Sequence, residues 1–311
     1  MKKLLTVIIM AFYAFGAQAN DIVTLIVPVA PGGGTDVLAR AIVENMTRQG
    51  IPMIISNKPG AERSIGANFV ATANPDGKTL FLGAISDTVL LPLFKYPGLQ
   101  FNEDTFVPVA FLATLPPVIT ASNNVPANNF KELVELIKKD PGKYQIGSFG
   151  KLSVMQANAI FAFAGATPTI VNYKGDVPLV VDLVGGHIPL GLNSLPPVKE
   201  LAKDGKLKII TMLTDERNKD FPNVGTIHEV NKWSSYYWFG IFAPPGTNPD
   251  LVKKYHTAFN NALNDEDVKT KLASQSYKER VMTQQQFAKF YKDQLKFYKP
   301  LVDQLVAKEN K

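Results

Sequence analysis

The amino-acid sequence predicts an α/β protein of two lobes, each built on a mainly parallel sheet flanked by helices, with a cleft between the lobes. Strands and helices alternate in two separate runs, residues 22–88 and 144–213, and such alternation is typical of parallel sheets. An aromatic-rich strand at 236–243 follows the second run and returns the chain to the first lobe. We therefore expect the first lobe to comprise residues 20–123 and 237–311, and the second lobe residues 124–236.

The first 19 residues have the pattern of a secretory signal peptide. Lys2 and Lys3 form a basic start, residues 4–14 an apolar run, and Ala17-Gln18-Ala19 a small-x-small cleavage site. The apolar run is shorter than the roughly 20 residues that a membrane span needs. We therefore predict that residues 1–19 are removed on export. The chain contains no cysteine, so its stability must come from packed cores and not from disulfides.

Charge and composition exclude several classes of function. The formal net charge is +6, and the basic residues are scattered over predicted helices, as at Lys138-Lys139. Because no pattern of aromatic and basic residues accompanies them, we predict no nucleic-acid partner. His187, His228 and His256 stand without a second histidine or a carboxylate at metal-ligand spacing. We predict no metal site and no cofactor.

A glycine-rich turn joins the first predicted strand to the first helix. Residues 22–29 are rich in β-branched side chains, and residues 37–46 carry apolar side chains at helical spacing. Glycine lets the backbone approach a ligand closely, and the unpaired N–H groups of a helix start, capped by Thr35 or Asp36, attract anions. Alternatively, the glycines only shape the turn. The predicted anion contacts are Pro31, Gly32, Gly33, Gly34, Thr35 and Asp36.

Two more strands complete the first alternating run. A strand at 53–56, a helix at 65–73, a turn at 74–77 and a strand at 79–84 follow in order. The carboxyl ends of parallel strands meet at one edge of a sheet, so the loops 30–35, 58–64 and 85–88 should converge on one crevice. The candidate ligand contacts in these loops are Arg63, Ser64 and Ser86. A dinucleotide fingerprint fits less well, because Val37 stands where its third glycine belongs.

The second run forms the second lobe. Strands at 107–114 and 118–122 should carry the chain across, with the crossing near 121–125. The elements expected beyond it are helices at 129–139, 153–164, 177–184 and 198–203 and strands at 144–148, 169–173, 188–192 and 208–213. Helices at 249–263, 266–273 and 284–305 complete the chain. Two α/β lobes joined by two crossing segments are typical of binding proteins that close about a hinge.

A loop in the second lobe is the counterpart of the glycine-rich turn. It leaves a strand, and Ser153 would cap the following helix, which makes Ser148, Gly150, Lys151 and Ser153 candidate anion contacts. Ser148 and Lys151 also match S-x-x-K, the serine–lysine pattern of some hydrolases, but the S-D-N and K-T-G motifs that accompany it there are missing. A hydrolase that uses Ser148 and Lys151 is the alternative from another class of function.

Two further candidates follow the strand at 169–173. Tyr173 would either contact a ligand or pack between the lobes, and Asp176 would either contact a ligand or cap a helix. Trp233 and Trp238 could stack on a ligand, but a core or hinge position fits them better. Tyr173 and Asp176 are therefore included among the predicted contacts, and the two tryptophans are not.

Several segments of the chain match the landmarks of one known family in their order. They are Pro31-Gly32-Gly33-x-Thr35-Asp36-x-x-Ala39-Arg40, Asn57-Lys58-Pro59-Gly60-Ala61 with Ile65-Gly66-Ala67, Pro75-Asp76-Gly77-Lys78-Thr79-Leu80, Tyr173-Lys174-Gly175, and Asp182-Leu183-x-Gly185-Gly186. With them the chain resembles the Bug family, the periplasmic binding proteins of tripartite tricarboxylate transporters. The resemblance implies a two-lobe, type II-like binding-protein fold and a periplasmic location.

The resemblance also implies a function without catalysis. The protein would bind a small carboxylate, such as a dicarboxylate or a related organic acid, and deliver it to membrane-embedded transporter subunits. We expect a monomer. An aromatic or amphipathic monocarboxylate is the alternative ligand, because Phe149, Leu152 and Val154 narrow the second anion site. The chain departs from the family where Glu62-Arg63 replaces a common Gly-Gly and where Lys151-Leu152 replace small residues, so the ligand is left open.

Overall fold

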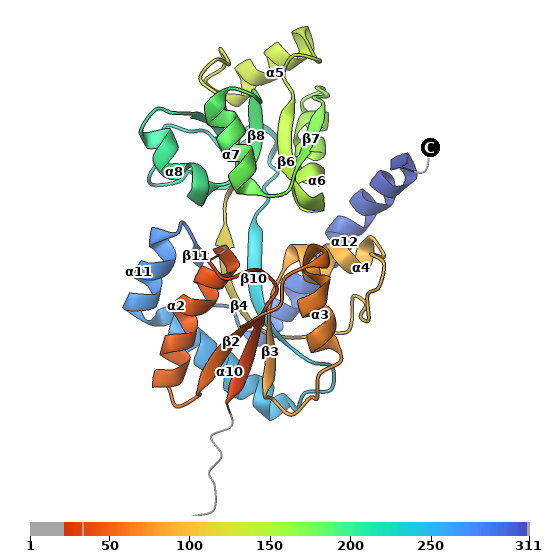
Figure 1. Ribbon diagram of the computed structural model, residues 1–311, viewed down its shortest axis with the longest axis vertical. Coiled ribbons are helices and arrows are strands. Elements are labelled where there is room, and N and C mark those ends of the chain that lie inside the picture. Colours follow the sequence, from red (N-terminus) through yellow and green to blue (C-terminus); the bar gives the residue numbers. More distant parts are fainter. Residues whose placement is uncertain (1–21, 33, 310–311) are drawn as a thin grey trace, which may run out of the picture.

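The computed structural model describes residues 22–32 and 34–309, which form two lobes, each built on one β-sheet with helices packed on it (Figure 1). The expected signal peptide, residues 1–19, and Gly33 lie outside the described residues. The two-lobe α/β fold that the sequence predicts is confirmed. Within the described part, no helix is both long and apolar enough to cross a membrane.

The first sheet has six strands in the order β11-β4-β10-β3-β1-β2. They are β1 (Val23–Val27), β2 (Met53–Asn57), β3 (Thr79–Ala84), β4 (Val107–Leu115), β10 (Tyr237–Ala243) and β11 (Lys278–Glu279). β1 pairs in parallel with β2 and β3, whereas β10 is antiparallel to β3 and β4. The sheet is therefore mixed and not mainly parallel, because β10 brings the chain back from the second lobe and so runs against its neighbours.

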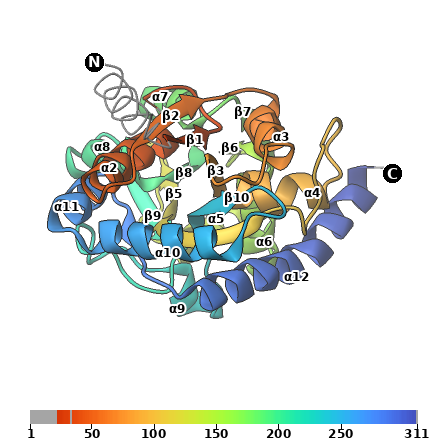
Figure 2. The ribbon, with the colours of Figure 1, turned by 90° about the horizontal axis from the view of Figure 1, so that it is seen from below.

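Helices cover both faces of the first sheet. α2 (Gly34–Arg48), α10 (Pro249–Asn264) and α11 (Glu266–Ser274) lie on one face, and α3 (Ser64–Ala71), α4 (Leu91–Leu93) and α12 (Gln284–Glu309) lie on the other (Figure 2). Successive strand residues point to opposite faces. Leu25 and Val27 of β1 therefore pack in the core beneath α2, while Ile26 packs in the core beneath α3 and α12.

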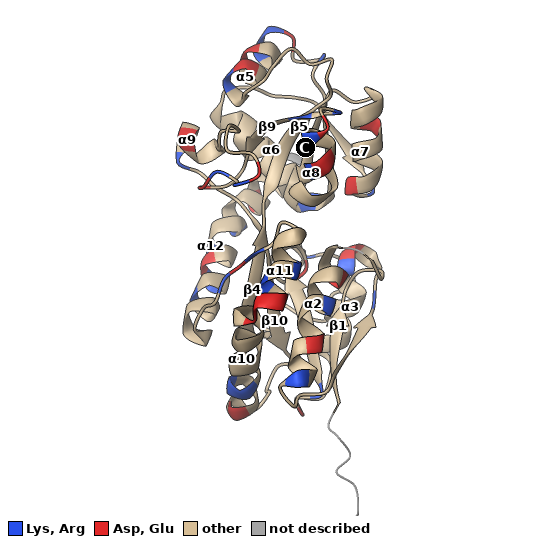
Figure 3. Cartoon of the chain, turned by 90° about the vertical axis from the view of Figure 1, so that its left-hand side faces the viewer, with Lys and Arg blue, Asp and Glu red and all other residues tan. Residues whose placement is uncertain are grey.

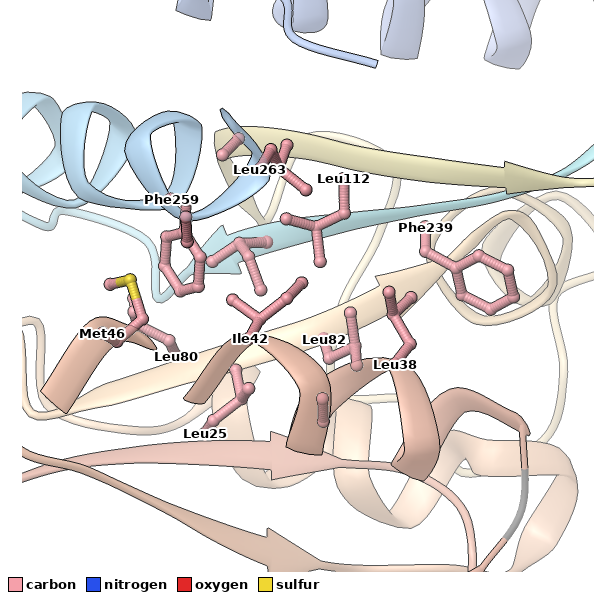
Figure 4. Packing of buried hydrophobic residues seen from close by; sticks show 14 of the residues in the cluster. Leu25, Leu38, Ile42, Met46, Leu80, Leu82, Leu112, Phe239, Phe259 and Leu263 are labelled. Carbon is pink, nitrogen blue, oxygen red and sulfur yellow. The ribbon is translucent and has the colours of Figure 1, made fainter. Parts of the chain in front are cut away.

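α2 packs through the apolar stripe that its sequence pattern predicts. Leu38, Ile42 and Met46 follow one another at intervals of one helical turn and are fully buried. In Figure 4 they lie against strand residues such as Leu82, and Phe259 of α10 joins the same core. This packing fixes α2 on the sheet and places its first residues at the end of β1 that faces the second lobe (Figure 1).

The second sheet has five strands in the order β7-β6-β8-β5-β9. They are β5 (Pro117–Ala121), β6 (Ile146–Phe149), β7 (Ile170–Tyr173), β8 (Leu190–Ser194) and β9 (Lys208–Met212). The helices of this lobe are α5 (Phe130–Lys139), α6 (Gly150–Phe163), α7 (Asp176–Gly185), α8 (Leu195–Lys203) and α9 (Ile227–Asn231). β6 is parallel to β7 and β8, but β5 is antiparallel to β8 and β9 because it enters from the first lobe.

The chain crosses between the lobes earlier than the sequence predicts. β4 ends at Leu115 in the first sheet, and β5 begins at Pro117 in the second, where it pairs with β8 and β9. The expected crossing near 121–125 and the boundary at residue 123 are therefore wrong. Both strands are apolar and buried, so hydrophobic pattern alone does not reveal which sheet a strand joins. The return strand β10 begins at Tyr237.

α12 adds a third connection between the lobes. Its residues Tyr298 and Val302 share a core with Leu152 and Met155 of α6, and Figure 1 shows α12 rising beside α6. The Ser235 hydroxyl, in the returning segment, accepts a hydrogen bond from Gln156 Nε2 of α6 at 2.8 Å and lies 3.3 Å from the Tyr298 hydroxyl. Besides the two chain crossings, the packing of α12 on α6 therefore joins the lobes.

Charged side chains of both signs are spread over the outer surfaces of the two lobes. Figure 3 shows blue and red segments interspersed along the helices. Lys271 pairs with Glu44 at 3.0 Å and Arg217 with Glu229 at 2.7 Å, and all four side chains are exposed. Exposed pairs of this kind contribute about 0–1 kcal/mol each, so the fold is held mainly by its apolar cores.

Candidate functional site

A cavity of about 770 Å³ lies between the lobes, next to the carboxyl ends of β1, β3, β6, β7 and β8. The residues that line it from the first lobe are Val29, Gly34, Thr35, Glu62, Arg63, Ala84, Ile85, Ser86, Leu90, Leu91, Leu115, Tyr237, Phe239 and Tyr277. From the second lobe they are Phe149, Gly150, Lys151, Leu152, Tyr173, Lys174, Gly175, Asp176 and Ser194. The size and position are those of a ligand site in an α/β protein.

The cavity brings together more than half of the residues that the sequence selects. Those on its wall are Gly34, Thr35, Arg63, Ser86, Gly150, Lys151, Tyr173 and Asp176. Those absent from its wall are Pro31, Gly32, Asp36, Ser64, Ser148 and Ser153. Gly33 falls outside the described residues. That any of these residues binds a ligand stays a prediction.

Asp36 organises the glycine-rich turn from within the protein. Its side chain is buried and accepts hydrogen bonds from Gly32 N and Asn57 Nδ2, both at 2.9 Å, and from Arg40 Nε at 2.8 Å. Burial on its own would raise the pKa of this carboxyl, but the bonds from Arg40, Gly32 and Asn57 outweigh it and hold the pKa below its usual value. Asp36 therefore fixes the turn and leaves Gly34 and Thr35 at the cavity.

The turn before α3 has an unusual backbone. After Gly60, with φ of 118°, three residues with side chains adopt the left-handed region: Ala61 at 44°, Glu62 at 51° and Arg63 at 76°. They form the short 3₁₀ helix η1 (Ala61–Arg63). Left-handed φ values suit glycine and are costly for other residues, and runs of them are rare. This strained turn carries Glu62 and Arg63 to the cavity wall.

Arg63 faces a buried carboxylate that the sequence did not single out. Asp87 lies in the π-helix η2 (Ile85–Leu90), is completely buried, and accepts a hydrogen bond from Ala84 N through Oδ1. Its Oδ2 has no hydrogen-bond partner among the described residues and lies 3.9 Å from Arg63 Nη1. Burial raises the pKa of Asp87 to about 6, although the charge of Arg63 opposes that rise. Nothing local in the sequence marks Asp87, because its role depends on a partner from another loop of the chain.

On the second lobe, the loop after β6 differs from the prediction. α6 begins at Gly150, with φ of 68°, so Ser153 lies inside the helix and does not cap it. Ser148 donates a hydrogen bond to the Ser153 hydroxyl at 2.7 Å, and both side chains are buried behind the cavity wall. The ammonium group of Lys151 lies 4.4 Å from the centre of the Phe94 ring. Ser148 is thus paired with Ser153, and no hydrogen bond joins it to Lys151 in the described part of the chain.

Tyr173 and Asp176 line the cavity but are engaged within their own lobe. The Tyr173 hydroxyl donates to Asp182 Oδ2 at 2.8 Å. The Asp176 carboxylate accepts from Ser194 Oγ at 2.5 Å, from Ser194 N and from Asn193 Nδ2 at 2.9 Å. Burial raises the pKa of Asp176 to about 6, although these hydrogen bonds oppose the rise. Its lone pairs are satisfied by the protein.

Aromatic residues of the first lobe were missed as wall residues. Tyr237 and Phe239 come from β10 and Tyr277 from the segment before β11. The buried hydroxyl of Tyr237 has no hydrogen bond to any described residue, although Ser153 lies near enough to affect its pKa. The sequence does show the aromatic-rich strand, but it cannot show that alternate residues of that strand face the cleft. Trp238, between them, points into the core and is 1% exposed.

Two lobes with a cavity between them, connected by crossing strands, define a solute-binding protein of the two-lobe type. A family model described as the tripartite tricarboxylate transporter family receptor, TctC, matches residues 38–306. The chain belongs to this receptor family. It is 31% identical to a UPF0065 protein of Bordetella pertussis over 91% of this chain and 89% of that one. It is 28% identical to protein BugT of the same organism, over 92% and 90%, so the Bug resemblance is confirmed.

Solved structures share the whole fold. A periplasmic transporter aligns with a TM-score of 0.80 and 33% identity, over 92% of this chain and 98% of that one. MatC from Rhodopseudomonas palustris with bound malate aligns with a TM-score of 0.75 and 27% identity, over 90% and 98%. R. palustris Rpa4515 with adipate aligns with a TM-score of 0.80 and 25% identity, over 90% and 96%. The chain is thus a solute-binding receptor of the TctC and Bug type.

Proposed function

We propose that this protein captures a small organic acid in the periplasm and presents it to the membrane subunits of a tripartite tricarboxylate transporter. The observation that carries the proposal is the cavity between the lobes, where Arg63 of the first lobe and Lys151 of the second both line the wall. The starts of α2 and α6, at Gly34 and Gly150, lie at the same wall. Cationic side chains and helix starts are the features that favour anionic ligands.

Two ligand classes are compatible with this proposal. A dicarboxylate or related organic acid is supported by the relatives whose structures contain malate and adipate. An aromatic or amphipathic monocarboxylate is supported by the apolar residues of the wall, among them Phe149 and Leu152.

The proposed function includes no covalent chemistry. The family is one of receptors, and Ser148, the nucleophile of the alternative hydrolase, is fully buried and hydrogen-bonded to Ser153. An acyl-enzyme would need that hydroxyl at the cavity. Incubation with a serine-reactive fluorophosphonate, followed by intact-mass measurement, tests whether Ser148 acts as a nucleophile. A covalent adduct on Ser148 would support the hydrolase alternative.

We infer export through the signal pattern at residues 1–19 and a monomer in solution. The basic start, the apolar run and the small-x-small site support the first inference. Mass measurement of the protein recovered from a periplasmic extract should show a chain that begins at Asn20. Light scattering of the same sample should give the mass of one chain, and a stable dimer would contradict the monomer.

Ligand binding without turnover is tested by thermal unfolding. A ligand that binds only the folded protein stabilises it by about 2.7 kcal/mol at 100 times its dissociation constant, which raises the melting temperature measurably. A panel of short mono- and dicarboxylates should contain at least one that produces this rise and is recovered unchanged. If no carboxylate in a broad panel shifts the transition, the proposed function is wrong.

Closure of the lobes is tested by small-angle scattering. The chain crosses at Pro116 and again before Tyr237, and these crossings are the proposed hinge. A saturating carboxylate should reduce the radius of gyration. Unchanged dimensions would leave binding intact but contradict the hinge, and would indicate that the contact between α6 and α12 holds the lobes rigidly together.

A further inference from the structure

We propose that Arg63 is the side chain that binds the carboxylate of the ligand and selects its class, and that the ligand is a monocarboxylate with an apolar body of aromatic size. This inference rests on the proposed function and specifies its ligand. It is carried by the strained turn that presents Arg63, by the unused donors of the guanidinium group, and by the different character of the opposite wall.

The backbone conformation of the turn indicates that Arg63 has a functional role. Its φ of 76° lies in the left-handed region, as do those of Ala61 and Glu62 before it. Glycine would adopt these angles without strain. Strained residues of this kind are held by their surroundings and concentrate at ligand sites. Glycine at position 63 would fit the backbone better, so what arginine adds here is its side chain, which reaches the cavity wall.

The guanidinium group of Arg63 keeps its donors available. The nearest carboxylate oxygen, Asp87 Oδ2, is 3.9 Å from Nη1, beyond hydrogen-bond distance. The side chain makes no hydrogen bond to any other described residue and is 32% exposed. Asp87 thus attracts Arg63 and orients it without occupying its N–H groups. A planar guanidinium with free N–H groups is the group best suited to bind a carboxylate through two parallel hydrogen bonds.

Two phenols of the first lobe also line the cavity. The Tyr237 hydroxyl is buried without a hydrogen bond to a described residue, and Tyr277 lies beside the start of α2, where its hydroxyl is 3.2 Å from the position of a Cβ on Gly34. The charge of Arg63 acts on both phenols, whose pKa values burial raises. A buried donor without a partner is costly unless a ligand satisfies it. The Tyr237 hydroxyl is therefore a second donor on the cavity wall that a bound ligand could satisfy.

The opposite wall carries Lys151, Lys174 and the start of α6 but is less suited than Arg63 to hold a second carboxylate. The carboxylate of Asp176 lies there and would repel another anion. Lys151 is held over the ring of Phe94, and Lys174 is exposed. The apolar side chains that line the cavity are Phe149 and Leu152 from the second lobe and Leu90, Leu91, Leu115 and Phe239 from the first. Malate has little apolar surface to bury against them and adipate has only its methylene chain, whereas a phenyl ring on a short chain has more.

Calorimetry with four probes, benzoate, 3-phenylpropionate, adipate and malate, tests the inference. The wild-type protein should bind 3-phenylpropionate at least about tenfold more tightly than adipate or malate, and its amide, 3-phenylpropionamide, should bind far more weakly. Arg63→Gly, which relieves the backbone, should weaken 3-phenylpropionate by about tenfold to a hundredfold. Arg63→Lys keeps the charge but loses the planar guanidinium with its paired N–H groups. Its affinity for 3-phenylpropionate should lie between those of the wild type and of Arg63→Gly.

Ala61→Gly is the matched control, because it relaxes the same turn at a residue that does not line the cavity. It should leave all affinities within about twofold of the wild type. Tighter binding of adipate or malate than of 3-phenylpropionate, or equal affinities of the wild type and a folded Arg63→Gly, would overturn the inference and leave the proposed function standing. Failure of every carboxylate to bind the wild type would overturn both.

Discussion

The two sides of the cleft look alike in the sequence and differ in the structure. Each side has a strand that ends in a glycine-containing loop and leads into a helix, at Gly32–Thr35 in the first lobe and at Ser148–Ser153 in the second. In the first lobe, Arg63 and Tyr237 reach the cavity with hydrogen-bond donors unused by described residues. In the second lobe, Asp176, Tyr173 and the serines are bonded to their own lobe.

This contrast indicates a division of roles: the first lobe supplies donors for the ligand, and the second lobe mainly shapes the cavity. The first lobe carries the strained turn at 61–63 and the buried Asp87, both of which store unfavourable free energy next to the cavity. In the described part of the second lobe there is no comparable run of left-handed residues at the cavity, because Gly150 takes the positive φ at the start of α6. We expect changes on the first side to alter binding, and changes on the second side to alter stability.

The largest expected effect is that of Arg63→Glu. Reversal of the charge removes a charge-assisted hydrogen bond worth about 1.5–3 kcal/mol and places a carboxylate beside both the ligand and Asp87. Affinity for 3-phenylpropionate should fall by more than about a hundredfold. Calorimetry measures this, with Ala61→Gly as the control in the same turn, at a residue that does not line the cavity. Binding within about threefold of the wild type would show that both sides of the cleft contribute through backbone alone.

The next effect concerns pH and separates Asp87 from Asp176. Both pKa values are raised to about 6, above the usual value of 3.8, so the folded protein binds protons more readily than the unfolded chain between about pH 4 and 6. Stability should therefore rise as pH falls through 6 toward 4, by up to about 3 kcal/mol for each group. Urea unfolding from about pH 7.5 to 4.5 measures it, and Asp87→Asn or Asp176→Asn should each flatten part of the curve.

Only one of these two groups should also couple to the ligand. A carboxylate at Arg63 draws the guanidinium away from Asp87 and adds a negative charge nearby, so binding raises the pKa of Asp87 and takes up a proton. Affinity for 3-phenylpropionate should then increase as pH falls from about 7.5 to 6. Asp87→Asn should abolish that dependence, and Asp176→Asn should preserve it. The reverse result would place the carboxylate on the second side of the cleft.

A smaller effect, on stability alone, is expected from Ser153→Ala. It leaves the buried Ser148 hydroxyl without its partner and should lower the free energy of unfolding by about 1–3 kcal/mol. Because neither serine lines the cavity, affinity should change by less than about twofold. Chemical unfolding measures the change in stability, and calorimetry on the same sample measures the change in affinity. A large loss of affinity with unchanged stability would restore the loop as an anion site.

The smallest expected effect is that of Lys151→Ala. Lys151 lies over Phe94 of the first lobe, and a partly exposed contact between an ammonium and a ring contributes about 0.5–1 kcal/mol. Affinity should fall by no more than about fivefold. Phe94→Leu should have the same effect and, combined with Lys151→Ala, should add nothing further. A loss of about fiftyfold or more would mean that the lysine leaves the ring to bind the ligand.

The two-lobe architecture could be predicted from the sequence. The two alternating runs of strands and helices predict two α/β lobes, and the aromatic-rich strand predicts that the chain returns to the first lobe. Because the carboxyl ends of parallel strands meet at one edge of a sheet, the sequence also places Gly34, Arg63 and Ser86 at one crevice. These predictions succeed because hydrophobic periodicity and the ends of parallel strands are local properties of the chain. The predictions fail where a segment pairs with residues far away in the sequence. At the first crossing between the lobes, β5 is as apolar as β4, so the sequence does not reveal which sheet it joins.

The chemistry of the cleft depends on contacts that the sequence does not reveal. The left-handed turn that carries Arg63, the position of Asp87 behind it, and the arrival of Tyr237 and Tyr277 from the far end of the chain all depend on packing between distant segments. The same holds for Ser153, whose hydroxyl is drawn into the lobe by Ser148 and Leu192 instead of capping a helix. A pattern of residue types records which groups are present, but burial and long-range contacts determine which of their hydrogen bonds are left for a ligand.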